Sequence, residues 1–175
     1  IDIICSNIGL AGTDVQLVNA MSREFVLKQI LSRVKDKYDV ILLDCMPSLG
    51  MLTINALAAS DEVLIPVEAS YLPIKGLQQL LRTIGKVRRQ INPKLQIMGI
   101  LFNLVDVQTK DARNNMEQLR QAYGSQIHVF HSFIPFSVRM KEAAREGQSI
   151  FKYDPKGKVA IAYMNSIKEA FENVR

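Results

Sequence analysis

The stretch DVILLDCMPSLG, residues 39–50, contains the clearest indication of the fold class. Four aliphatic residues in succession, from Val40 to Leu43, lead into the carboxylate of Asp44, and a turn follows. A short, continuously apolar run of this kind is typical of a strand buried on both faces of a parallel sheet. We therefore expect a strand over 39–44, a turn, and a helix over 50–59.

Similar apolar runs recur along the chain and alternate with helical patterns. The runs cover 1–5, 62–67, 96–105 and 127–134, and helices are expected over 22–36, 73–91, 110–123, 137–146 and 158–174. Strands that alternate with helices indicate βαβ units. The predicted fold class is therefore α/β, with an open, mostly parallel sheet and helices on both faces. Ligands of such sheets bind at the carboxyl ends of the strands.

Length and composition indicate a single globular domain over residues 1–175. The chain has 175 residues, of which 48% are hydrophobic and 22% charged, with a formal net charge of +5. No apolar run approaches the roughly 20 residues that a membrane-spanning helix requires. Cys5 and Cys45 lack the paired spacing of a zinc site and are expected to be buried free thiols. Because the chain enters an apolar run at Ile1, we expect it to be the C-terminal portion of a longer domain.

The carboxylate of Asp44 has two interpretations. A nucleotide-binding sheet presents such an acid to Mg²⁺ beside a phosphate loop of the form GxxxxGK[ST]. The chain contains no such loop. From the residues alone, Asp44 is either a magnesium-binding acid or a loop acid that caps the next turn.

Long stretches of the chain resemble one known family, the ParA/Soj chromosome- and plasmid-partitioning ATPases of the MinD/ParA group of deviant Walker P-loop ATPases. The resemblance rests on SNIGLAGTDVQLVNAMSRE (6–24), YDVILLDCMPSLGMLTINALAASDEVLIPV (38–67), YLPIKGLQQLL (71–81) and IPFSVRMKEAAREGQSIFKYDPKGKVAIAY (134–163). It covers nearly the whole chain in order, so it is more specific than any single short motif. It implies a P-loop NTPase-like fold whose first strand and phosphate loop precede Ile1.

The resemblance also implies a nucleotide site with ATP and Mg²⁺ as cofactors. Asp44 would be the Walker B acid that holds Mg²⁺ through water and serves hydrolysis. Asn103, at the end of the run 96–105, would bind the adenine edge, although a turn asparagine that bonds its own loop is the alternative. The main chain around Pro135 would border the adenine. The full-length protein is expected to hydrolyse ATP, and this chain alone is expected to be inactive.

Partners follow from the same resemblance. It implies an ATP-dependent homodimer that binds double-stranded DNA nonspecifically, is stimulated by a ParB-like centromere-binding protein, and works in the cytoplasm on the nucleoid. Arg139 matches a family arginine that contributes to DNA binding. At the position of a second family arginine this sequence has Gln108. Lys110 and Arg113 nearby are therefore expected to supply that positive charge.

Two further groups of residues leave alternatives open. A basic stripe on the polar face of the helix expected over 73–91 is either a solvated surface or a set of phosphate contacts; its members are Lys75, Arg82, Lys86 and Arg89. His128 and His131 stand three apart in an expected strand, which places them on opposite faces. They are therefore predicted to be core or edge residues and not shared metal ligands.

Two other functions compete with partitioning. A MinD-like, membrane-associated division-site ATPase would need a basic amphipathic tail at the C-terminal end. No such tail follows Phe171 in this sequence, so membrane binding is not expected. The other candidate is a non-enzymatic adaptor that keeps the fold and has lost the phosphate loop.

Overall fold

The computed structural model describes residues 1–46, 48–69 and 73–172. They fall into two compact units, and each is described by itself. The first unit comprises Ile1–Asp61 and Gln79–Gln96, and the second comprises Glu62–Gln78 and Ile97–Arg175. The single domain expected over the whole chain stays a prediction.

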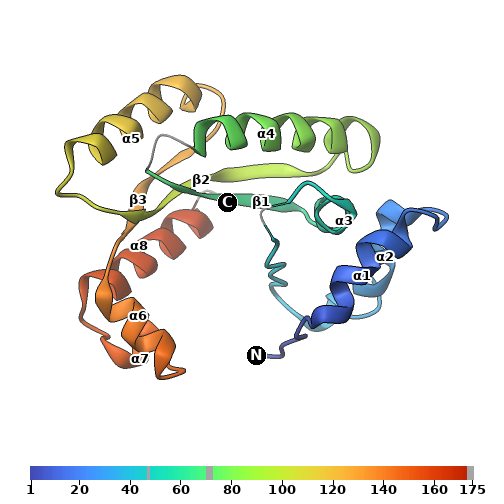
Figure 1. Cartoon of the computed structure of the whole chain (residues 1–175), viewed down its shortest axis with the longest axis horizontal. Helices are drawn as coiled ribbons and strands as arrows, with labels where there is room; N and C mark the ends of the chain where they lie inside the picture. Colours follow the sequence, from blue (N-terminus) through green and yellow to red (C-terminus); the bar gives the residue numbers. More distant parts are fainter. Residues whose placement is uncertain (47, 70–72, 173–175) are drawn as a thin grey trace. The chain divides into compact units, whose positions relative to one another are not determined.

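The second unit is built on an open three-stranded sheet of order β1-β2-β3, in which β2 and β3 run parallel (Figure 1). The strands are β1 (Glu62–Glu68), β2 (Gln96–Val105) and β3 (Val129–Pro135). They confirm the runs predicted over 62–67, 96–105 and 127–134 to within two residues. Phe102 and Phe130 are among the largest fully buried side chains, as continuously apolar strands require.

Helices lie on both sides of β3. α5 (Lys110–Tyr123) and α8 (Lys158–Glu172) flank it from opposite sides in Figure 1. α6 (Val138–Arg145) and α7 (Ile150–Tyr153) join α8 around an apolar cluster that includes Phe130 and Ile134. Hydroxyl caps start these helices: the Thr109 side chain accepts a hydrogen bond from the Ala112 N–H, and the Ser137 side chain accepts one from the Arg139 N–H.

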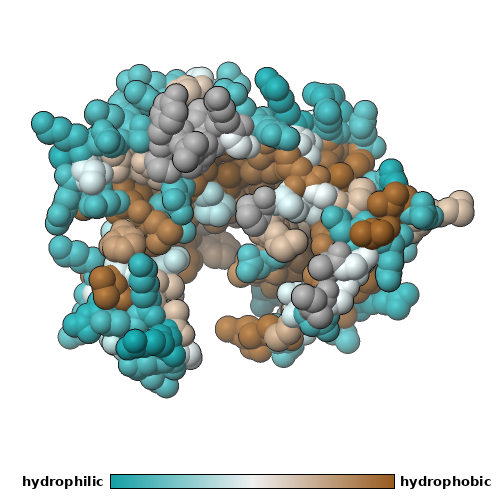
Figure 2. Space-filling model, in the orientation of Figure 1, coloured by the Kyte–Doolittle hydropathy of each residue, from teal (hydrophilic) through white to brown (hydrophobic). Residues whose placement is uncertain are grey.

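α4 (Pro73–Gln90) is amphipathic, as its apolar spacing predicts. Leu77, Ile84 and Val87 are buried along one side of the helix. The opposite side is exposed, and Figure 2 shows hydrophilic residues along the outer edge of α4.

The first unit contains α1 (Ile8–Leu17), η1 (Arg23–Phe25), α2 (Val26–Leu31), η2 (Lys35–Lys37), α3 (Met51–Ala59) and the C-terminal part of α4. Buried asparagines connect these pieces. Asn55 accepts a hydrogen bond from the Leu27 N–H at 3.1 Å and donates to the Arg23 carbonyl at 2.7 Å. Asn92 donates to the Leu57 carbonyl at 3.0 Å and to the Ser60 carbonyl at 2.7 Å. These hydrogen bonds join α3 and the residue after it to segments of the first unit that are distant in the sequence.

The strands predicted over 1–5 and 39–44 are absent from the described residues. An isolated strand cannot satisfy its backbone N–H and C=O groups, and no described segment forms a ladder with either run. Most of their large apolar side chains are consequently exposed; Leu42, for example, is 88% exposed. Cys5 and Cys45 are free but exposed, so the expectation of buried thiols was wrong.

The predictions for the N-terminal helices were only partly right. The helix expected over 22–36 is broken into η1, α2 and η2, and α1 was not predicted. α1 is held by the Asp14 carboxylate, which accepts the Leu52 N–H at 3.1 Å in the first turn of α3. Such a long-range cap has no signature in the local sequence.

Candidate functional site

The carboxyl end of the sheet in the second unit brings together two of the predicted nucleotide-binding residues. Val105 of β2 stands opposite Pro135 of β3, and the Phe136 N–H donates to the Val105 carbonyl at 3.0 Å. Asn103 lies two residues before that point, at the same edge. An asparagine side chain and the main chain around Pro135 therefore neighbour each other where parallel sheets bind ligands.

The residue after Asn103 has an unusual backbone conformation. Leu104 has a φ of 53°, in the left-handed region that a leucine rarely adopts. The Asn103 side-chain oxygen accepts the Leu104 N–H at 3.0 Å, which supports this turn. This is the local hydrogen bond that the turn-asparagine alternative predicts, so that contact is present. It engages only the side-chain oxygen of Asn103. Within the described part of the chain no hydrogen bond engages the Asn103 NH₂ group.

A shallow depression of about 560 Å³ adjoins this turn. Among described residues its lining includes Leu104, and it gathers three carboxylates, from Glu68, Asp106 and Asp111. Acidic walls disfavour phosphate groups, so the depression does not suit a triphosphate.

Asp44, the third predicted nucleotide-binding residue, belongs to the first unit. It is exposed and lies in a segment without helix or strand. No hydrogen bond or ion pair to a described residue engages its carboxylate. The group is therefore available to a ligand, although the strand expected to carry it is not formed.

The basic residues predicted to contact DNA lie on helices that follow β2 and β3. Lys110 and Arg113 are exposed in the first turn of α5, and Arg139 is exposed in the first turn of α6. Both helices begin at the carboxyl edge of the sheet (Figure 1). Arg139 is not an isolated cation, because its guanidinium lies 3.7 Å from the Glu142 carboxylate. The side chains of Arg139 and Glu142 are 64% and 37% exposed, so this ion pair contributes little to stability and can exchange partners.

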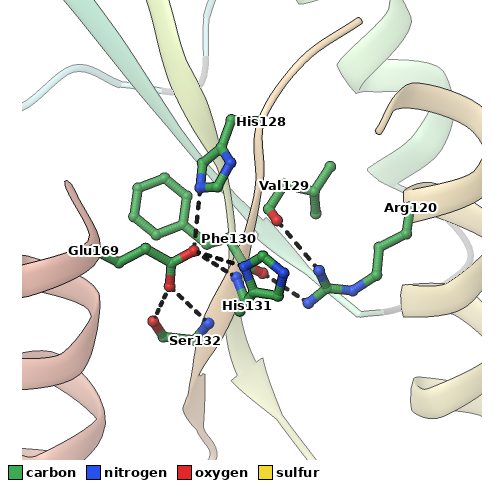
Figure 3. A network of polar contacts seen from close by, with 7 residues as sticks. All are labelled: Arg120, His128, Val129, Phe130, His131, Ser132 and Glu169. Carbon is green, nitrogen blue, oxygen red and sulfur yellow. Dashed lines mark hydrogen bonds and ion pairs between the residues drawn. The ribbon is translucent and has the colours of Figure 1, made fainter. Parts of the chain in front are cut away.

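A polar network on β3 was not predicted from the sequence. Figure 3 shows Glu169 of α8 and Arg120 of α5 reaching β3 from opposite sides. The Glu169 carboxylate accepts the backbone N–H of His131 at 2.7 Å and that of Ser132 at 2.9 Å, and it also accepts the Ser132 hydroxyl. Arg120 donates to the carbonyls of Val129 at 3.2 Å and Phe130 at 2.7 Å.

The network lies where the pairing of β2 and β3 is irregular. Ile100 stands opposite Val129 and Phe102 opposite Phe133, so two steps along β2 match four along β3. Such a bulge leaves backbone groups without ladder partners. Glu169 and Arg120 supply the missing acceptors and donors. The network is therefore structural, and nothing in the local sequence marks it.

The bulge also corrects the expectation for the two histidines. Simple alternation would put them on opposite faces, but the extra residues turn both toward Glu169. His128 Nε2 lies 3.1 Å and His131 Nδ1 3.4 Å from the same carboxylate oxygen. Burial by itself would raise the pKa of Glu169, but hydrogen bonds from Ser132 and His131 lower that pKa to about 2. Among described residues no group of three or more His, Cys, Asp or Glu side chains could hold a metal ion.

Comparison with known proteins decides the family. A family model described as "AAA domain" matches residues 1–97. The chain is 41% identical over 173 residues to the sporulation initiation inhibitor protein Soj of Bacillus subtilis, covering 99% of this chain and 68% of that protein. It is 42% identical over 166 residues to the chromosome-partitioning ATPase Soj of Treponema pallidum, covering 95% of this chain and 65% of that protein. The chain belongs to the ParA/Soj family of partitioning ATPases.

Solved structures agree with a ParA/Soj fold. The cobyrinic acid a,c-diamide synthase of Mycobacterium smegmatis, solved with bound ADP and magnesium, is 31% identical at a TM-score of 0.70, covering 82% of this chain and 62% of that one. A McdA variant of Cyanothece, solved as its ATP complex, is 22% identical at a TM-score of 0.82, covering 95% of this chain and 64% of that one. The second likeness concerns the fold alone. Both confirm the open α/β sheet, and this ParA/Soj chain spans about two thirds of the length of the proteins it matches.

No helix among the described residues of this ParA/Soj chain is long and apolar enough to cross a membrane.

Proposed function

We propose that the whole protein carrying this chain is a partitioning ATPase that binds ATP with Mg²⁺, dimerises on ATP, and binds double-stranded DNA nonspecifically. Hydrolysis would be stimulated by a ParB-like centromere-binding protein on the nucleoid. The single observation that carries the proposal is about 40% identity to Soj proteins over nearly the whole chain.

Separate groups of the chain suit Mg²⁺ and adenine, whereas the acidic depression beside Leu104 does not suit the phosphate groups. The exposed Asp44 carboxylate would hold the metal through water, since Mg²⁺ prefers oxygen ligands and keeps several waters. The Asn103 NH₂ group is available to donate to a ring nitrogen of adenine, beside the main chain at Pro135. Bound Mg²⁺ neutralises charge that develops on the phosphates.

ATP binding and hydrolysis by the full-length protein test the nucleotide part. Asp44→Asn should abolish Mg²⁺-dependent hydrolysis, because an amide is a far poorer partner for a hydrated divalent cation. The matched control is Asp39→Asn, the same change at an exposed acid five residues earlier in the same segment. If the wild-type protein binds no ATP, or binds equally with and without Mg²⁺, the ATPase proposal fails and the non-enzymatic adaptor remains.

DNA binding tests the second part. Arg139→Ala should weaken binding to duplex DNA and make it less dependent on salt, since each lost phosphate contact reduces counterion release. Glu142→Gln should do the opposite, because it frees the Arg139 guanidinium from its partner at 3.7 Å. Unchanged affinity in both variants would remove Arg139 from the proposed DNA surface.

A further inference from the structure

The exposed side of α4 carries positive charge without any acid. The 18 residues Pro73–Gln90 contain no Asp or Glu. Its described cations are Arg82, Lys86, Arg88 and Arg89, all exposed. The side chain of Lys75, the first cation of the predicted stripe, lies outside the described part of the structure.

Three of these cations share one face of the helix. Arg82, Lys86 and Arg89 are spaced by four and three residues, so they project within about 60° of one another at 3.6 residues per turn. Arg88 is rotated from Arg89 by about 100° and stands apart from that face. We call Arg82, Lys86 and Arg89 the α4 basic face; all three residues are exposed.

Within the part of the chain that the structure describes, the α4 basic face has no acidic partner for its charge. No carboxylate of a described residue forms an ion pair with any of the three cations. Like charges at these spacings destabilise a helix by roughly 0.2–0.5 kcal/mol for each pair. By contrast, α6 pairs Arg139 with Glu142 at 3.7 Å.

Neither the helix dipole nor solvation fully explains the cations of α4 and the lack of acids there. Cations in the last turn of a helix are favoured by its dipole, which accounts for Arg88 and Arg89. It does not account for Arg82 or Lys86 in the preceding turns. Solvation alone explains exposed cations but not the absence of acids from the helix.

The surroundings of the α4 basic face suit a phosphate backbone. A shallow depression of about 640 Å³ lies along it, lined by the three cations with Gln79, Leu81, Thr83 and Gly85. Glutamine and threonine are common donors to phosphate oxygens. α4 has no aromatic residue on which single-stranded bases could stack, and among its described residues no large apolar side chain is exposed for insertion into a membrane.

We propose that the α4 basic face contacts the sugar-phosphate backbone of double-stranded DNA, in addition to the residues proposed to do so after β2 and β3. From Arg82 to Arg89 it extends about 10 Å along the helix axis. A duplex presents about six phosphate charges over that length. The inference rests on the proposed DNA binding and adds a surface to it.

The test measures duplex affinity of the full-length protein, with ATP present, over a range of salt concentrations. The variant Arg82→Ala/Lys86→Ala/Arg89→Ala loses three phosphate contacts, so the slope of log K against log salt should fall by about 2.7. If the two proteins bind equally near 1 M salt, the variant binds about 500-fold more weakly at 0.1 M. The control is Arg88→Ala, the same chemical change on the same helix, which should alter the slope by less than about 0.5.

The outcomes separate this inference from the proposed function. If the triple variant keeps the wild-type slope of log K against log salt, the α4 basic face does not contact DNA and the inference is wrong. The proposed function still stands in that case if Arg139→Ala weakens DNA binding. Equal loss in Arg88→Ala also overturns the inference, because then net charge and not the face is responsible. A wild-type protein that binds no duplex overturns both. Loss of structure is not a competing explanation, since alanine favours helix and removes like-charge repulsion; circular dichroism should show an unchanged fold.

Discussion

Replacing Glu169 by glutamine should cost stability at neutral pH and much less in acid. The carboxylate accepts the N–H groups of His131 and Ser132 at 2.7 and 2.9 Å, and its side chain is only 17% exposed. Its pKa is lowered from 4.5 to about 2 in the folded protein. A shift of about 2.5 units corresponds to about 3 kcal/mol of stability contributed by the charged form.

The sign of the pH dependence follows from the direction of that shift. A lowered folded pKa contributes its full stabilisation above the unfolded value of 4.5 and loses it as the pH falls toward 2. Urea unfolding of wild type and Glu169→Gln should therefore differ by about 2–3 kcal/mol at pH 7 and by less than half of that at pH 3. Glu172→Gln, an exposed acid on the same helix, should stay within about 0.5 kcal/mol of wild type. A loss at Glu169 that is equally large at both pH values would refute the reasoning, because it could not come from the carboxylate charge.

Two other substitutions test the packing inside each unit, one substitution for each. Asn92→Ala removes hydrogen bonds of 3.0 and 2.7 Å to the carbonyls of Leu57 and Ser60, and should cost about 2 kcal/mol in urea unfolding because a buried acceptor is left unpaired. Gly99→Ala places a Cβ 2.6 Å from the Phe130 ring, which is fully buried and cannot move aside; thermal unfolding should show a loss of about 1–3 kcal/mol. A wild-type melting temperature for Gly99→Ala would mean that β2 and β3 lie farther apart there than the structure has them.

The three strands of the second unit and most of its helices could be predicted from the sequence because local and tertiary preferences agree there. The run 96–105 is continuously apolar and is buried between two other strands. Thr109 and Ser137 are good N-cap residues directly before amphipathic segments, so α5 and α6 start where expected. Asn103 and Pro135 could be placed at one edge from topology alone, since parallel strands end together.

The remainder depends on partners that are distant in the sequence. The run 39–44 has every local property of a strand, yet a strand exists only where a neighbour pairs with it, and no described segment does. The histidines were assigned to opposite faces by a rule of strict alternation. One bulge in β3 breaks that rule, and it is stabilised by Arg120 and Glu169, which come from two different helices.

The sequence and the structure rank the basic residues differently as candidates for DNA contact. From the sequence, Arg139 is the leading candidate for DNA contact, and the stripe on α4 is more readily interpreted as a solvated surface. In the structure Arg139 already faces Glu142 at 3.7 Å, so binding a phosphate there must first break an ion pair. Arg82 has no such competitor among the described residues, and its nearest charged neighbour on the same helix face is Lys86, a like charge. A polyanion therefore relieves repulsion on α4 but only exchanges partners on α6, and the salt dependence of DNA binding should be reduced more per lost cation by substitutions on α4 than by Arg139→Ala.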